Sequence, residues 1–162
     1  MPQVLLTLLI LSASWAKGAP APILTLLYNT DDLTFLQNES SEAASGQGLS
    51  QDQARSLATD LSESLASDNP EDPIYIAKRL ANVGIFQTYA GDLTAGDQYL
   101  RAALSHFNQN QGLFDPRLPR LLSAIGINGF LRKDYDTAED HFRWSQNIQH
   151  RSYGLFAAEQ TT

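Results

Sequence analysis

The side chains best suited to chemistry in this chain are three histidines, His106, His141 and His150. Imidazoles bind metal ions and transfer protons, and two of them on one helix face can share a metal. No two of these histidines have that helical spacing, and the chain has no cysteine to add a thiolate ligand. We therefore expect each histidine to lie on a solvated helix face, with no metal site.

Four carboxylates are the second candidate, and they lie close together in the sequence: Asp134, Asp136, Glu139 and Asp140. Paired carboxylates can act as general acid and base, but acidic residues also stabilise the first turn of a helix. The second role fits this spacing better. No nucleophile elbow, phosphate loop or dinucleotide fingerprint is present. We expect no catalytic residue and no cofactor.

Composition narrows the class of protein further. The 162 residues are 43% hydrophobic and carry a net charge of −7, which suits one domain with an acidic surface. Nucleic acid is not an expected partner, because phosphate binding needs a basic face. The absence of cysteine also excludes disulfides.

The N-terminus is typical of a secretory signal peptide. The apolar run Val4–Leu11 is too short to span a bilayer and has the length of a signal-peptide core. Residues 1–16 are therefore expected to be removed, by cleavage after Ala16 or, as the second choice, after Gly18. No Lys or Arg precedes the run, and the alternative is a buried helix that Pro20 and Pro22 would stop. The signal reading predicts a periplasmic or secreted protein, without a membrane span in the mature chain.

Residues 17–49 are expected to be a flexible N-terminal segment. Within it, the apolar stretch Ile23–Tyr28 predicts either a short strand or a helix stub. Asp31–Gln37 could form a helical turn, and residues 38–48 are polar and small, which favours a connector.

Residues 50–162 read as a helical domain. Ser50 and Gln53 form a capping box, and a first amphipathic helix follows, up to Asn69-Pro70. Asp72-Pro73 should cap and open the next helix, which Gly91 should end in a left-handed conformation. Its partner helix begins at Leu93.

The sequence then nearly repeats itself 42 residues later. The matched pairs are Gly84 with Gly126, Asp92 with Asp134, Leu93 with Tyr135, Gly96 with Ala138 and Leu100 with Phe142. Asp115-Pro116 should open the second unit, and Lys133 stands at the position of the turn glycine. Gly112-Leu113-Phe114 recurs as Gly154-Leu155-Phe156, which predicts the start of a third unit.

Small residues at matched positions have a steric explanation. A glycine inside a helix costs about 1 kcal/mol relative to alanine. We therefore expect Gly84 and Gly96 to lie where two antiparallel helices cross closely, with Gly126 and Ala138 doing the same in the next pair. Leu100 and Phe142 should fill the space beside each crossing.

On these residues the chain resembles the tetratricopeptide repeat family. The match is a small residue, a Gly-Asp-Leu or Lys-Asp-Tyr turn, a small residue, an aromatic residue or leucine, and another small residue (Ala103 and Ser145). It covers residues 73–162 well and 50–68 loosely, although Gln87, Gly129 and Lys133 depart from the usual pattern. The period is longer than the common 34 residues, and resembles that of kinesin light chains and bacterial extracytoplasmic relatives.

The resemblance implies an all-α fold, an antiparallel helix-pair α-solenoid. It would contain about two full repeats, a preceding amphipathic helix and a truncated third repeat. In this family the first helix of each pair lines a concave face that binds peptides. By matching position, that face would present Lys78, Asn82, Ile85, Tyr89, Arg120, Ser123, Ile127 and Phe130. Lys78 and Asn82 have the spacing of a carboxylate-binding pair, but the partner asparagine one repeat later is Ala124.

Three functions are compatible with this reading. The favoured one is a non-catalytic protein- or peptide-binding scaffold, a fragment of a longer array that could self-associate through its open C-terminal repeat. The second is the docking or regulatory portion of an enzyme or envelope-assembly complex whose catalytic part is absent. The third is an oligomerisation spacer. The sequence does not identify the partner.

Overall fold

The structure is a computed structural model, and it describes residues 22–28, 49–68, 72–110 and 115–157. Every regular element in these ranges is helical, so the all-α prediction is confirmed. The predictions for the signal peptide, for Asp31–Gln37 and for the connector 38–48 fall outside the described residues. So do the first connector, Gly112-Leu113-Phe114, and the end of the predicted third unit.

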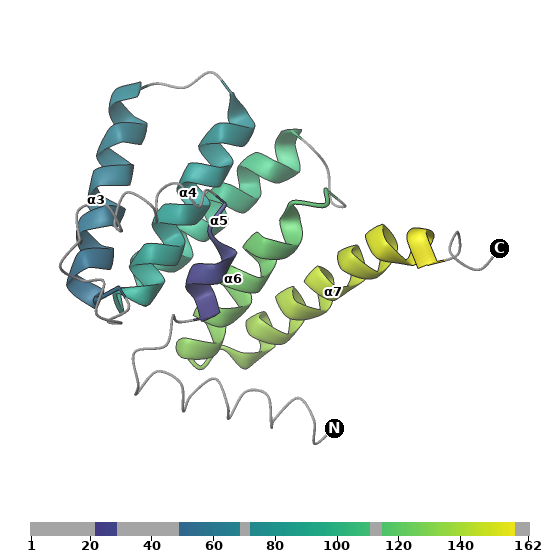
Figure 1. The fold of residues 1–162 in the computed structure, drawn as a ribbon. Coiled ribbons are helices and arrows are strands. Elements are labelled where there is room, and N and C mark those ends of the chain that lie inside the picture. The colour runs from purple at the N-terminus through teal and green to yellow at the C-terminus, as the bar shows by residue number, and fades with distance from the viewer. Residues whose placement is uncertain (1–21, 29–48, 69–71, 111–114, 158–162) are drawn as a thin grey trace.

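Within the described residues, one short 3-10 helix precedes five α-helices, each of which packs on the next along the chain (Figure 1). The elements are η1 (Pro22–Leu26), α3 (Gln51–Asp68), α4 (Pro73–Tyr89), α5 (Leu93–Asn110), α6 (Leu118–Leu131) and α7 (Tyr135–Ala157). The two predicted helix pairs are therefore α4 with α5 and α6 with α7. In the described part of the chain, no helix has the length and apolar character that a membrane crossing requires.

The predicted helix caps are present at the start of α3 and α4. The amide of Ser50 donates to the side-chain oxygen of Gln53 over 2.9 Å, and the Gln53 amide donates to the Ser50 hydroxyl over 3.2 Å. The Asp72 carboxylate accepts from the amide of Ile74. These bonds satisfy amides that have no partner within the helix.

The predicted start of α6 is wrong by two residues. Asp115-Pro116 does not cap the helix, which begins at Leu118 with Pro119 in its first turn. The Asp115 carboxylate instead accepts from the amide and the guanidinium of Arg117. This local pair holds a turn at Pro116 and Arg117, and the helix starts only after it.

The two turns within the helix pairs share one backbone conformation. Gly91, between α4 and α5, has φ +89°, and Lys133, between α6 and α7, has φ +66°. In both turns the following aspartate accepts from an amide three residues on, Asp92 from Ala95 and Asp134 from Thr137. The repeat therefore preserves the geometry although one glycine has become a lysine.

Both helix pairs cross at their first glycine, as expected. A Cβ added to Gly84 would lie 2.7 Å from Cγ of Leu100 and 3.0 Å from the carbonyl oxygen of Gly96. A Cβ added to Gly126 would lie 2.6 Å from the Phe142 ring. Glycine is thus required for the same contact, with Leu100 or Phe142, in each pair.

A buried polar contact joins the second pair to the first. The Asn128 amide nitrogen, on α6, donates to the Thr88 hydroxyl over 2.9 Å and to the Leu93 carbonyl over 3.0 Å. A Cβ on Gly96 would collide with both Thr88 and Asn128. Because a buried polar group needs its partner, this contact favours one register of α6 against α4 and α5.

The predicted third unit does not begin at Gly154-Leu155-Phe156. These residues belong to α7, which continues to Ala157. The sequence differs beyond the two connectors, because Pro116 comes soon after Gly112 whereas no proline comes after Gly154. A single glycine costs a helix only about 1 kcal/mol, and it does not end α7.

We expect Lys133→Gly to stabilise the protein by on the order of 1 kcal/mol, because it removes the cost of a left-handed side-chain-bearing residue. The reciprocal change, Gly91→Lys, should destabilise it by a similar amount. Urea denaturation of both variants measures this. Equal midpoints for wild type and Lys133→Gly would show that the turn carries no strain.

We expect Gly84→Ala to destabilise the protein by about 1–3 kcal/mol through overpacking. Gly126→Ala should cost less, because Phe142 is only half buried and its ring can move, whereas Leu100 is fully buried. Gly129→Ala is the matched control, since its added Cβ would lie no closer than 3.3 Å to any neighbour. The melting temperatures of both variants are measured by calorimetry. Equal melting temperatures for Gly84→Ala and Gly129→Ala would contradict the close helix contact at Gly84.

Candidate functional site

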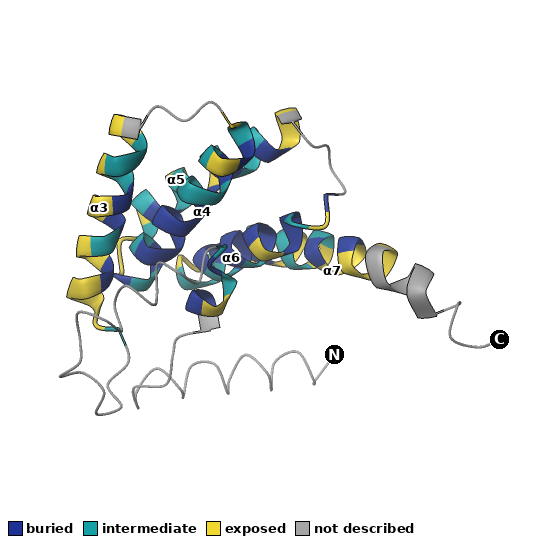
Figure 2. Cartoon of the chain, turned by 45° about the horizontal axis from the view of Figure 1, so that its top comes forward, coloured by how far each residue is buried: buried dark blue, intermediate teal, exposed yellow. Residues whose placement is uncertain are grey.

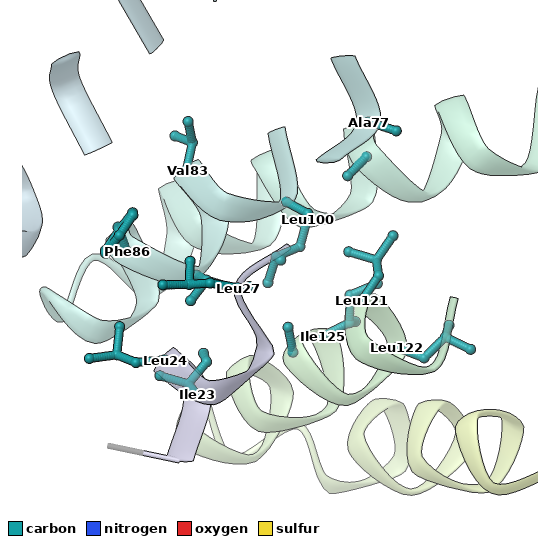
Figure 3. Packing of buried hydrophobic residues seen from close by; sticks show 14 of the residues in the cluster. Ile23, Leu24, Leu27, Ala77, Val83, Phe86, Leu100, Leu121, Leu122 and Ile125 are labelled. Atoms are coloured by element: carbon teal, nitrogen blue, oxygen red, sulfur yellow. The ribbon is translucent and has the colours of Figure 1, made fainter. Parts of the chain in front are cut away.

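The segment 22–28 lies on a surface that α4 and α6 form together, here called the α4–α6 face (Figure 1). Ile23, Leu24 and Leu27 are 1%, 7% and 2% exposed, and they belong to the main hydrophobic core. Figure 3 shows these three side chains between α4 and α6, near Phe86 and Ile125. A stretch remote in sequence thus occupies the helices expected to bind a peptide.

Two side chains from different helix pairs hold one peptide group of this segment. The Asn82 side-chain oxygen, on α4, accepts from the amide of Tyr28 over 2.8 Å. The Arg120 guanidinium, on α6, donates to the carbonyl of Leu27 over 3.2 Å. Asn82 and Arg120 thus bind the N–H and the C=O of the same Leu27–Tyr28 peptide group, and we call them the peptide clamp. Every non-proline peptide group offers this donor and acceptor, so the clamp does not depend on side-chain identity.

The Tyr28 side chain occupies the end of the face next to α6. Its ring centroid lies 5.9 Å from that of Phe107, and its hydroxyl donates to the carbonyl of Arg117 over 2.5 Å. The Arg117 guanidinium lies over the same Phe107 ring, at 5.8 Å from its centroid. Burial raises the pKa of the Tyr28 hydroxyl well above its ordinary value. The phenol therefore stays protonated and keeps its hydrogen bond.

Asp115 positions the Arg117 backbone that receives this bond. Its buried carboxylate pairs with the Arg117 guanidinium at 2.6 Å. The hydrogen bonds from Arg117 hold the pKa of Asp115 below its ordinary value, and the charge of Lys78 adds to this effect. The role of Lys78 at this face is therefore electrostatic, because its positive charge stabilises the Asp115 carboxylate.

The segment gains about as much free energy from burial as it loses in conformational entropy. Burying its three aliphatic side chains contributes about 5–9 kcal/mol. Ordering seven residues costs about 7–14 kcal/mol, and the three hydrogen bonds return about 3 kcal/mol. Because burial alone does not exceed the cost of ordering, the hydrogen bonds of the clamp and of Tyr28 decide whether the segment stays bound.

The eight residues predicted for the partner-binding face have several different environments. Asn82 and Arg120 form the clamp, and Tyr89 donates its hydroxyl to the carbonyl of Leu49, just before α3. Ile85 is fully buried in the core, and Ile127 packs against it partly exposed.

Of the remaining three residues, Ser123 and Phe130 contact α7, whereas the charge of Lys78 acts on Asp115. The Ser123 hydroxyl lies 3.1 Å from that of Ser145, and the Phe130 ring lies 5.7 Å from the Tyr135 ring. The structure therefore does not bring all eight residues around the segment 22–28. The proposed Lys78–Asn82 carboxylate pair also has a different geometry here, because Asn82 accepts from an amide.

Sequence reasoning missed three contributors, Phe107, Asp115 and Arg117. Asp115 was expected to open the second unit, and no pattern in the sequence singles out Phe107 or Arg117 for this site. The apolar pattern of Ile23–Tyr28 was visible, but nothing in the sequence indicated where it packs.

The described contacts of His141 and of the acidic residues near the start of α7 lie within this helix. The Nδ1 atom of His141 lies 2.7 Å from the Thr137 carbonyl. Asp134 caps α7, and its hydrogen bonds with Thr137 lower the pKa of its carboxyl. Glu139 pairs with Arg143 one turn on. No group of three or more metal-ligating side chains gathers among the described residues.

One side of α7 is exposed, as the yellow parts of this helix in Figure 2 show, and its exposed residues are mostly polar where their side chains are described. Asp136, Asp140, Arg143 and Asn147 are exposed there, and Tyr135 is the one exposed large hydrophobic residue of that stretch, at 58%. Self-association through this end remains a prediction, and a polar outer face is what a terminal repeat needs.

The high pKa of Tyr28 predicts a loss of stability at alkaline pH. Its contribution is fully present below about pH 10, the ordinary tyrosine pKa, and is lost as pH rises towards the higher folded-state value. Tyr28→Phe should therefore lose less stability than wild type between pH 8 and pH 11, as measured by urea midpoints. Tyr75→Phe, at an exposed ring on α4, is the control and should keep the wild-type pH dependence. Identical curves for wild type and Tyr28→Phe would contradict the buried phenol.

Comparison with known proteins gives no relative from which to transfer a function: no protein-family model, curated protein or solved structure matches this chain.

Proposed function

We propose that this chain is a non-catalytic scaffold that binds a short peptide segment of a protein partner on its α4–α6 face. The helix pairs would be tetratricopeptide-like repeats of an α-solenoid. The N-terminal apolar run, which is typical of a signal peptide, supports a location in the bacterial envelope or the secreted space.

The observation that carries the proposal is the peptide clamp. Asn82 and Arg120 bind both polar groups of one peptide bond, while the surrounding core accepts the aliphatic side chains. Proteins that bind short peptides use this combination, in which main-chain hydrogen bonds give affinity and a few side-chain contacts give specificity.

The matched helix pairs support the scaffold part of the proposal. The glycine crossings at Gly84 and Gly126 and the left-handed turns at Gly91 and Lys133 repeat at the same offset. Repeated helix pairs build extended surfaces from first helices, here α4 and α6. The peptide clamp takes one residue from each.

A peptide-display selection on the full-length protein tests the function. We expect enrichment of peptides with aliphatic residues. The selected peptides are then measured in a Leu27→Asp background, which weakens the chain's own segment on the face, so that a further change in the site acts on the peptide alone. In this background Arg120→Glu should bind the peptides at least tenfold more weakly, since a carboxylate repels the bound carbonyl. Lys133→Glu in the same background is the matched control, with the same charge change in the turn between α6 and α7, and should bind as the Leu27→Asp parent does.

Circular dichroism should show that both variants are folded. The proposal fails if the wild type enriches no peptide, or if Arg120→Glu binds the selected peptides as tightly as Lys133→Glu.

A further inference from the structure

The α4–α6 face is occupied by the chain's own residues, and the way they are held specifies a ligand pattern. Ile23, Leu24 and Leu27 are buried, whereas Thr25 is exposed and Leu26 is half-buried. The face therefore contacts the first, second and fifth residues of the stretch 23–28 through side chains, and the sixth, Tyr28, through its ring and hydroxyl.

We propose that the partner carries this same pattern, two adjacent aliphatic residues, an exposed residue, a partly buried residue, an aliphatic residue and a tyrosine, and that residues 22–28 are a tethered competitor for it. This inference rests on the proposed function and adds the class of ligand and its regulation. The partner binds by displacing the segment from the α4–α6 face.

The hydrogen bond of Tyr28 makes the last position selective for tyrosine. Its hydroxyl donates to the carbonyl of Arg117, which the Asp115–Arg117 pair holds in place. A phenylalanine at this position removes the donor and leaves the carbonyl without that bond. Sites built to bind a hydroxyl discriminate strongly against analogues that lack it.

The clamp makes the segment replaceable by another chain. Asn82 and Arg120 contact only main-chain atoms of the Leu27–Tyr28 peptide group. A foreign peptide of the same pattern presents the same donor, acceptor and aliphatic groups. No covalent bond holds the segment except its own chain, in which 20 residues separate Tyr28 from Leu49.

The tether sets how strongly the segment competes. Linkers of about this length give effective concentrations in the millimolar range. For a peptide with an intrinsic Kd of about 10 μM, a competitor of equal affinity at about 1 mM weakens the apparent affinity by roughly 100-fold. Cutting the tether should therefore raise the apparent affinity for the peptide by the same factor.

The test uses the full-length chain with a specific protease site inserted between Ser45 and Gly46, and a fluorescent peptide with the sequence of residues 20–30. Binding is followed by fluorescence anisotropy of the labelled peptide while the protein is titrated from about 1 μM to about 1 mM, before cleavage and after the freed N-terminal fragment has been removed by gel filtration. We expect cleavage to tighten binding on the order of 100-fold. The peptide with Tyr28→Phe should bind at least tenfold more weakly, and the peptide with Leu27→Asp should not bind.

A second measurement avoids the cleaved chain. Full-length Leu27→Asp weakens the resident segment without cutting it, and we expect it to bind the wild-type peptide more tightly than the wild-type chain does. Thr25→Asp, at the exposed position of the segment, is the matched control and should change the affinity much less.

The inference is overturned if the cleaved chain stays folded and does not bind the peptide, or if both the cleaved chain and Leu27→Asp unfold. Either result makes residues 22–28 a permanent part of the core. It is also overturned if the Tyr28→Phe peptide binds equally well. Failure of the proposed function is distinguishable, because that requires the display selection on the intact chain to yield no peptide of any pattern.

Discussion

The close crossing of two helices at a glycine is the constraint on which the architecture depends. Backbone contact at Gly84 brings α4 against α5 and lets Leu100 fill the space beside the crossing. The same geometry at Gly126, with Phe142, sets α7 against α6. Because the spacing within each pair is fixed in this way, the first helices of the two pairs can lie near each other with a regular separation.

That separation creates the surface on which residues 22–28 pack. Neither α4 nor α6 alone covers the segment, and the clamp needs one side chain from each. The buried contact of Asn128 with Thr88 and Leu93 fixes how the second pair meets the first. The site is therefore a product of the inter-pair geometry, with each clamp residue contributing one hydrogen bond.

Local and periodic features could be predicted from the sequence. The capping box at Ser50 depends on residues three apart, and the left-handed turn at Lys133 follows from its match to Gly91. The glycine crossings follow from the 42-residue repeat, because two mid-helix glycines at one position imply a steric demand. Helix ends were less predictable where a side-chain pair intervened, as Asp115 and Arg117 do before α6.

The site could be predicted only in part, because its occupant is distant in sequence. Asn82 and Arg120 were expected to bind a partner from their positions in the repeat. Nothing in a six-residue apolar stretch specifies which surface it will cover, since almost any apolar face gains free energy from it. The role of the Arg117 carbonyl could not be predicted either, because every residue has a main-chain carbonyl and the residue type does not show which one accepts a hydrogen bond.

The two members of the clamp belong to different repeats, and this has a mechanical consequence. A peptide bound to both Asn82 and Arg120 is a brace between modules that otherwise meet through neighbouring helices. Bending one module against the other stretches one of these two hydrogen bonds. The segment on the α4–α6 face thus resists a change in the angle between the two helix pairs, in addition to covering their surface.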